Sequence, residues 1–120
     1  MAKDDYYVIV YRLLVYLYAC LKRRILFDEE IFEAAVRKHA GNDAYFNEVL
    51  RMMQDEFLIS GVTVKEAWSG DFVLTSELRD MRITPSGIRY LTDDGMMEKA
   101  GKQLAQEGKG IATPASIVGV

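Results

Sequence analysis

The segment that decides the fold is Met81-Arg82-Ile83-Thr84-Pro85-Ser86-Gly87-Ile88-Arg89-Tyr90-Leu91. Its first three residues indicate the end of a β-strand, and Thr84 followed by Pro85 is typical of a helix start. The threonine hydroxyl can accept a hydrogen bond from an amide of the first helical turn, and proline has no amide to leave unpaired there. The apolar residues from Ile88 to Leu91 suit a short helix that packs on a core. A strand that leads directly into such a helix is typical of helix-turn-helix domains with a β-wing.

The composition indicates one folded domain without a metal or a cofactor. The chain has 120 residues, of which half are hydrophobic and 28% are charged, as in ordinary globular proteins. The net charge of −3 argues against a surface that binds phosphates throughout. Cys20 is the single cysteine, which excludes an internal disulfide and fits a cytoplasmic protein. Because His39 is the single histidine, no Cys/His set for zinc exists.

Working outward from residues 81–91, the pattern predicts a series of helices and strands. The expected helices cover residues 5–24, 29–40, 43–56, 85–91 and a final segment after Asp93 or Asp94. In the second of these helices, the expected inward stripe consists of Ile31, Phe32, Ala35 and Val36. The expected strands cover residues 62–67, 72–74 and 81–83, after an extended segment at 57–61. This order predicts an α+β, mainly α, winged helix-turn-helix with a two- or three-stranded β-wing and additional C-terminal helices. We expect residues 1–107 to form the domain and residues 108–120 to form a flexible tail.

The first helix is apolar on nearly every side. Only Arg12 interrupts the apolar run from Tyr6 to Leu21, and this run is shorter than the ~20 residues that cross a bilayer. We therefore expect a buried helix and no membrane contact. A helix of this kind has to be covered on two sides. A second copy of the chain would supply the second side, so the sequence predicts a homodimer formed through the first helix, the last helix, or both.

Three segments resemble the YjcQ-like family of small phage and prophage proteins. They are Phe57-Leu58-Ile59-Ser60-Gly61-Val62, Ile83-Thr84-Pro85-Ser86-Gly87-Ile88-Arg89-Tyr90-Leu91 and Asp94-Gly95-Met96-Met97-Glu98-Lys99-Ala100. The resemblance extends from about residue 5 to about residue 105. It implies a winged-helix fold and a phage or prophage context, but it carries over no catalytic or binding residue. DNA binding is inferred for such proteins from the fold alone.

The third helix is the candidate DNA-reading element. Its expected core face consists of Phe46, Val49, Leu50 and Met53. Asn47, Arg51 and Gln54 then lie where they can reach base edges, and such side chains are common readers. However, Glu48 and Asp55 lie one helical turn on either side of the arginine and can pair with it or repel phosphates. A regulatory DNA-binding helix and a solvated face with an internal ion pair both fit this pattern.

Other cations are candidates for phosphate contacts. Arg37 and Lys38 close the second helix, and Lys65 is the only cation expected on the wing. The run Lys22-Arg23-Arg24 closes the first helix. Cations at helix ends also complement the helix dipole, which explains all but the wing lysine without a ligand.

The leading functional prediction is a DNA-binding phage or prophage regulatory protein of the winged-helix type, and a non-catalytic protein-interaction adaptor is the alternative. Tyr45 and Met52 share the outer flank of the third helix, and Trp68 lies next to the expected wing turn. Aromatic residues and methionine are enriched at the cores of protein interfaces. The sequence contains neither a pair of titratable groups placed for acid–base catalysis nor a phosphate-binding glycine loop. We therefore expect no catalytic residues.

Overall fold

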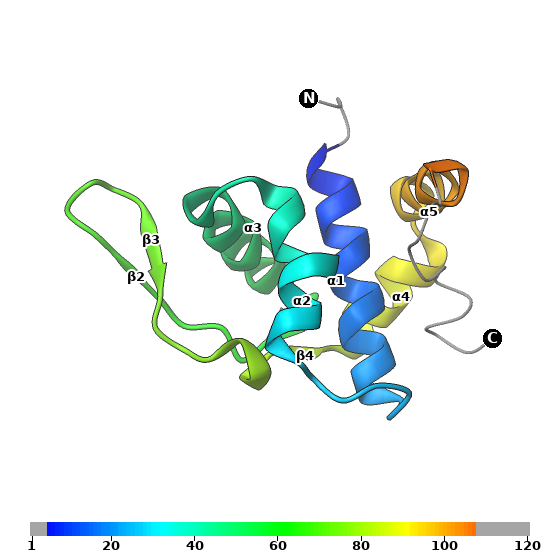
Figure 1. The fold of residues 1–120 in the computed structure, drawn as a ribbon, viewed down its shortest axis with the longest axis horizontal. Coiled ribbons are helices and arrows are strands. Elements are labelled where there is room, and N and C mark those ends of the chain that lie inside the picture. Colours follow the sequence, from blue (N-terminus) through cyan, green and yellow to red (C-terminus); the bar gives the residue numbers. More distant parts are fainter. Residues whose placement is uncertain (1–4, 108–120) are drawn as a thin grey trace.

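The computed structural model describes residues 5–107 and has a mainly helical α+β fold (Figure 1). The segment expected to be a tail, residues 108–120, lies outside the described residues. In chain order the elements are α1 (Asp5–Leu21), α2 (Glu29–Ala35), the 3-10 turn η1 (Arg37–Ala40), α3 (Asp43–Asp55), β1 (Ile59–Ser60), β2 (Val64–Glu66), β3 (Phe72–Leu74), the 3-10 turn η2 (Leu78–Asp80), β4 (Arg82–Ile83), α4 (Pro85–Asp93) and α5 (Gly95–Glu107). The α+β expectation is confirmed.

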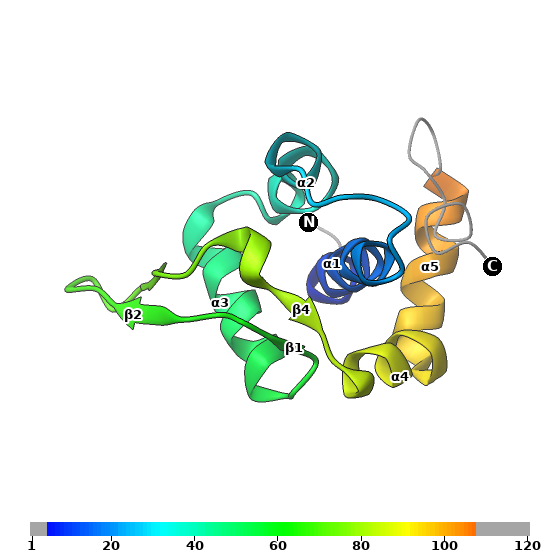
Figure 2. The same cartoon turned by 90° about the horizontal axis from the view of Figure 1, so that it is seen from below.

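The first helix lies at the centre of the molecule and is covered by its own chain. In both views α1 runs between α3 on one side and α5 on the other (Figures 1 and 2), and it also contacts α4 and β4. Its buried residues are Ile9, Val10, Tyr11, Leu13, Leu14, Val15, Tyr16, Leu17 and Ala19. The expectation that α1 needs a second chain to cover it was wrong, because α4 and α5 supply the second side. A homodimer stays a prediction, but the need to cover α1 no longer supports it.

No helix within residues 5–107 is long and apolar enough to span a membrane. In α1 the apolar surface is instead used in the core, where the side chains of several elements meet. The ring of Tyr16 packs against those of Phe27 and Phe32, with centroid distances of 5.7 and 5.3 Å, and the two phenylalanine rings contact each other at 5.2 Å. The Tyr16 hydroxyl also accepts from the backbone N–H of Asp28 at 3.0 Å, which fixes the start of α2 against α1.

The second helix is shorter than expected and has a different inward face. Phe32 and Val36 are fully buried, as predicted, but Ile31 is 57% exposed. Helix α2 ends at Ala35, and the chain continues as η1 after Val36 departs from helical geometry. A single short helix next to the aromatic cluster needs only one large inward side chain, and Phe32 fills that place. The inclusion of Ile31 in the inward stripe was therefore wrong.

The four strands form one interrupted hairpin. Ile59 pairs with Ile83 at the base, and Val64 pairs with Leu74 further out. Residues 61–63 separate the two ladders on the outgoing side and residues 75–81 on the returning side, so the returning side has four more residues. The turn η2 takes up this excess. Gly61 has φ +83° beside the Asp80 carbonyl, where a side chain would collide with the backbone.

Residues 81–91 join the hairpin to α4 as predicted. The Thr84 hydroxyl accepts from the Gly87 N–H at 2.9 Å and donates to the Phe57 carbonyl at 2.5 Å. Pro85 occupies the first helical turn. A Cβ atom at Gly87 would overlap the carbonyl oxygen of Leu58 and press on Ile83. Glycine is therefore required where α4 crosses the strand end.

Substitution at this crossing should lower stability. We expect Gly87→Ala to decrease the free energy of unfolding by about 1–3 kcal/mol, because the added methyl group meets backbone that cannot move aside. Urea denaturation measures this change. Gly95→Ala is the matched control, since its Cβ atom would meet nothing within 4 Å and alanine favours helix by about 0.5–1 kcal/mol. Equal effects of the two substitutions would contradict the proposed packing.

Candidate binding surface on α3 and the wing

The wing, defined here as residues 62–76, extends beyond the helices beside α3 (Figure 1). Its tip is a turn in which the Ala67 N–H donates to the Asp71 carbonyl at 2.8 Å and the Gly70 N–H donates to Ala67 at 2.9 Å. Strand β3 packs against α3. The candidate surface therefore combines two elements, and its geometry depends on how the wing is attached to the helix.

Gln54 attaches the root of the wing to α3. Its side-chain amide donates to the Val62 carbonyl at 2.7 Å, and its side-chain oxygen accepts from the Val62 N–H at 2.8 Å. The glutamine thus pairs with both polar groups of one backbone unit, as a neighbouring strand would. This residue was predicted to reach base edges, and the structure places its polar atoms inside the protein's own hydrogen-bond network.

Asn47 and Arg51 hold the outer part of the wing. The Asn47 amide donates to the Phe72 carbonyl at 3.0 Å. The guanidinium of Arg51 lies 5.0 Å from the centre of the Phe72 ring, which is within the range of a cation–π contact. All three predicted reading side chains are brought together, and each of them contacts the wing.

Arg51 is also neutralised along its own helix. It pairs with Glu48 at 2.5 Å and with Asp55 at 2.7 Å. These are the internal ion pairs that the spacing of Glu48, Arg51 and Asp55 allowed as an alternative to base reading. Residues 43–56 carry four carboxylates, Asp43, Glu48, Asp55 and Glu56, and this one arginine. The outer face of α3 is therefore acidic.

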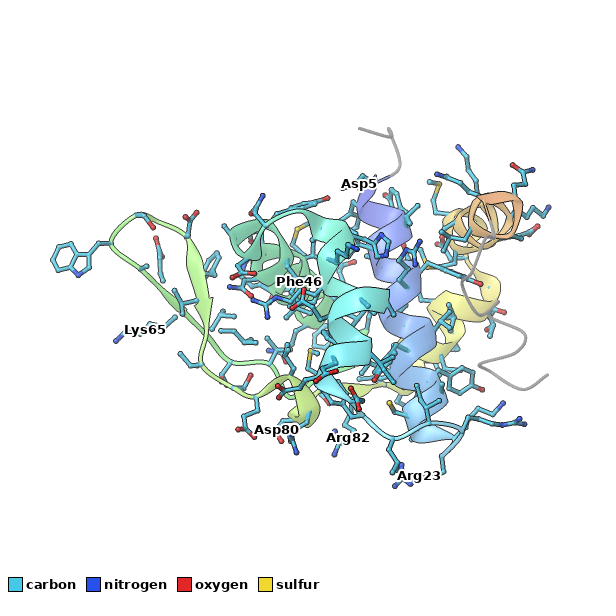
Figure 3. All side chains as sticks on the ribbon, in the orientation of Figure 1. Asp5, Arg23, Phe46, Lys65, Asp80 and Arg82 are labelled. Carbon is cyan, nitrogen blue, oxygen red and sulfur yellow. The ribbon has the colours of Figure 1, made fainter. Side chains whose placement is uncertain are left out.

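The predicted phosphate contacts lie on two separate elements. Arg37, on η1, pairs with Asp43 at 2.6 Å and more weakly with Glu33 at 3.7 Å. Lys38 follows it and is exposed. Lys65 is exposed on β2, and its side chain points away from the helices (Figure 3). Within residues 5–107, neither lysine has a carboxylate partner.

The three alternative anchors differ in exposure. Tyr45 is half-buried, and burial followed by a hydrogen bond with Asp5 raises the pKa of its hydroxyl. Met52 is 38% exposed, and Trp68 is fully exposed in the turn of the wing. Trp68 is thus an exposed aromatic side chain and contributes nothing to the core.

A cavity beside α3 was not foreseen from the sequence. Its volume is about 450 Å³, and it is lined by Tyr6, Tyr7, Arg51, Met52, Asp55, Glu56, Leu58 and Tyr90. We call it the tyrosine cavity. Burial, together with the nearby charges of Asp94 and Glu56 and the hydroxyls of Tyr6 and Tyr7, raises the pKa of Tyr90 to about 12. The tyrosines of α1 were evident in the sequence, but nothing in it indicated that α4 would bring Tyr90 beside them.

An exposed phenylalanine stands next to this cavity. Phe57 has φ +62° and is 74% exposed. Its N–H donates to Gln54 and the N–H of Leu58 donates to Met53, both at 2.9 Å, so the two bonds close α3 in the arrangement that normally has glycine at the left-handed position. A bulky residue there is uncommon. The strained backbone holds an aromatic side chain in solvent.

The described residues do not form a metal site. Within residues 5–107, no group of three or more His, Cys, Asp and Glu side chains lies close enough to hold an ion. The surface of α3 and the wing carries carboxylates, tyrosines, a methionine and a tryptophan.

These features define a small, mainly helical α+β domain with a protruding hairpin. Comparison with family models matches residues 11–107 to the YjcQ protein family. The match covers most of the chain, and the protein belongs to the YjcQ family. No curated protein and no solved structure matches it.

Removal of the Gln54 side chain should loosen the wing. We expect Gln54→Ala to lower the free energy of unfolding by about 1–3 kcal/mol, because the N–H and carbonyl of Val62 lose their partner. Urea denaturation checks this. Gln106→Ala on α5 is the control, since that residue is exposed and surface substitutions change stability by no more than about 0.5 kcal/mol. If both variants unfold alike, Gln54 does not hold the wing.

The tyrosine cavity should make stability depend on pH in the alkaline range. Between pH 10 and about 12 the folded protein keeps a proton on Tyr90 that the unfolded chain loses. The free energy of unfolding therefore falls as the pH rises through this window. Tyr90→Phe should show a smaller fall, and should match the wild type at pH 7. If the free energy of unfolding declines equally in both proteins, folding does not raise the pKa of Tyr90. Denaturant midpoints at a series of pH values give the comparison.

Proposed function

We propose that this YjcQ-family chain is a non-catalytic, cytoplasmic winged-helix module that binds another protein through α3, the tyrosine cavity and the wing. One observation carries the proposal. The polar side chains that α3 would need for reading DNA, Asn47, Arg51 and Gln54, are engaged with the wing, whereas apolar side chains next to them face solvent.

Charge supports a protein partner over DNA on this surface. Duplex DNA attracts cations at each phosphate, whereas on α3 the single arginine is paired with both Glu48 and Asp55, and Glu56 adds a further carboxylate at the end of the helix. To present Arg51 to a phosphate, the protein would have to break two ion pairs and a contact with Phe72. The same face would repel the phosphates on either side of that contact.

The exposed apolar groups support a protein contact. Met52, Phe57 and Trp68 are large side chains that stand in solvent around the cavity and on the wing. Methionine adapts its shape to a partner, and aromatic anchors are enriched at interface cores. Tyr45 is next to Tyr6, which lines the cavity, so it lies at the edge of the same surface.

The groups most suited to chemistry are not activated. Burial raises the pKa of the Cys20 thiol, which leaves less of the reactive thiolate at neutral pH. The tyrosine hydroxyls of the cavity have a raised pKa where a shift occurs, so they hold their protons more tightly. This supports a binding role without catalysis.

DNA binding by a phage or prophage regulator is the second candidate. The observation in its favour is that Lys38 and Lys65 are exposed cations without a carboxylate partner within residues 5–107, at the end of η1 and on the wing. The order of three helices followed by a hairpin is also that of a winged helix-turn-helix. In this case the wing and η1 would contact phosphates, and base reading would require α3 to release its side chains.

Binding to random duplex DNA separates the two candidates. We expect no change in the fluorescence anisotropy of a labelled duplex at low salt. Binding that weakens steeply with salt, and that is reduced when Lys38→Ala and Lys65→Ala are combined, would overturn the protein-partner proposal in favour of DNA.

Capture of partners from cells of the source organism tests the surface directly. A protein retained by the wild type should be lost with Met52→Asp and with Trp68→Ala, because each removes an exposed apolar contact. Lys102→Ala on α5 is the control, since Lys102 is exposed and lies outside the surface. If none of the surface substitutions changes the retention of the partner, the proposal is contradicted.

A further inference from the structure

A second cavity lies at the opposite end of α1 from the tyrosine cavity. Its volume is about 280 Å³, and three arginines, Arg23, Arg79 and Arg82, line it together with Cys20. Its apolar walls include Leu17, Phe27 and Ile83. Figure 3 shows the labelled Arg23 and Arg82 at the same end of the molecule, beyond the end of α1. We call this cavity the arginine groove.

Arg23 occupies a backbone position that favours glycine. Its φ is +62°. The Arg23 N–H donates to Cys20 at 3.1 Å and the Arg24 N–H donates to Ala19 at 3.0 Å, which is the paired closure that usually has glycine at this place. An arginine in the left-handed region is strained, because its Cβ atom crowds the neighbouring backbone in a way that glycine avoids. The side chain is therefore held at the groove despite a local cost.

Arg23 and Arg82 are oriented by backbone carbonyls rather than by carboxylates. One terminal nitrogen of Arg23 donates to Cys20 at 3.0 Å, and one terminal nitrogen of Arg82 donates to Arg79 at 2.7 Å and to Met81 at 2.8 Å. Within residues 5–107 the remaining nitrogens of these two guanidiniums have no partner, and neither charge is paired. Arg51 and Arg37, in contrast, are both neutralised.

The third arginine is only weakly paired. Arg79 lies 3.6 Å from Glu29 and 4.0 Å from Glu77, and all three side chains are more than half exposed. Exposed pairs of this length contribute little and can exchange for a stronger partner. The groove therefore concentrates positive charge in a protein with a net charge of −3.

The charges of Arg82 and Arg23 both act on the Cys20 thiol in the arginine groove. Burial raises the pKa of the Cys20 thiol, while the charges of Arg82 and Arg23 act on it in the opposite direction. Both guanidiniums thus lie close enough to stabilise a negative charge beside Cys20. The two arginines come from different elements, β4 and the turn after α1, and converge on the same space.

We propose that the arginine groove binds a small organic anion that carries a carboxylate or a phosphate ester on an apolar body. The planar guanidiniums of Arg23 and Arg82 match the geometry of such oxyanions. The apolar body would lie against Leu17, Phe27 and Ile83. The volume is just below the roughly 300–1,000 Å³ of small-molecule pockets, so the groove suits a small ligand and excludes a duplex. This site is separate from the protein-binding surface, and neither proposal depends on the other.

Cys20 provides a direct readout because it is the single cysteine and lines the groove. The rate at which the intact protein reacts with 4,4′-dithiodipyridine, an uncharged thiol reagent, is measured with increasing phenyl phosphate or benzoate. We expect each anion to slow the reaction in a saturable manner below about 10 mM. Comparison of these two anions tells whether a phosphate ester or a carboxylate is preferred. Benzyl alcohol and inorganic phosphate, which each lack one half of the ligand, should protect at least about tenfold more weakly.

Substitutions identify the groups responsible. Arg23→Gly should be at least as stable as the wild type, because glycine suits φ +62°, yet it should weaken protection about tenfold or more. Arg82→Gln should weaken protection similarly. Arg89→Gln is the control, since Arg89 lies on α4, bonds to Ser86 and does not line the groove. Unchanged protection in Arg23→Gly would overturn the proposal. So would equal protection by benzyl alcohol, by inorganic phosphate or by a DNA duplex, or no protection by either organic anion.

Discussion

The geometry of the candidate surface depends on the attachment of the wing to α3 by side-chain amides and one arginine. Gln54 pairs with both backbone groups of Val62, and Asn47 bonds to Phe72, whose ring lies under Arg51. A two-stranded hairpin alone is only marginally stable in water, so the helix fixes its direction. Because the same polar atoms cannot hold the wing and read a base edge together, this attachment decides which functions the face can perform.

The central helix then separates two chemically different ends of the molecule. At the start of α1, Tyr6 and Tyr7 line a cavity that also contains carboxylates of α3. At its other end, the chain turns through Arg23 beside Arg82 and the charge is positive. The middle of α1 is buried by its own chain, while residues at its two ends stay partly exposed, so one domain presents both ends to solvent. The two proposed sites therefore lie at opposite ends of α1, where one ligand does not block the other.

Local sequence signals predicted the helices and strands well, but they could not predict how these elements pack against one another. Thr84, Asn42 and Asp28 cap helices as their positions in the sequence indicate, since capping requires only neighbouring amides. The buried face of α3 also followed from its period. The partners of Gln54 and Asn47 could not be foreseen, because they depend on the four-residue excess in the hairpin, and the covering of α1 depends on where α4 and α5 return. For the same reason neither cavity was visible in the sequence.

The central claim is that the polar side chains of α3 are occupied by the wing in the working protein. Two-dimensional NMR of the side-chain amides of Asn47 and Gln54 in the wild-type chain, with and without random duplex DNA at low salt, tests it most directly. The account predicts slow hydrogen exchange for both amides and no change in their signals when DNA is added. Rapid exchange, or a shift confined to these amides and the wing in the presence of DNA, would contradict it.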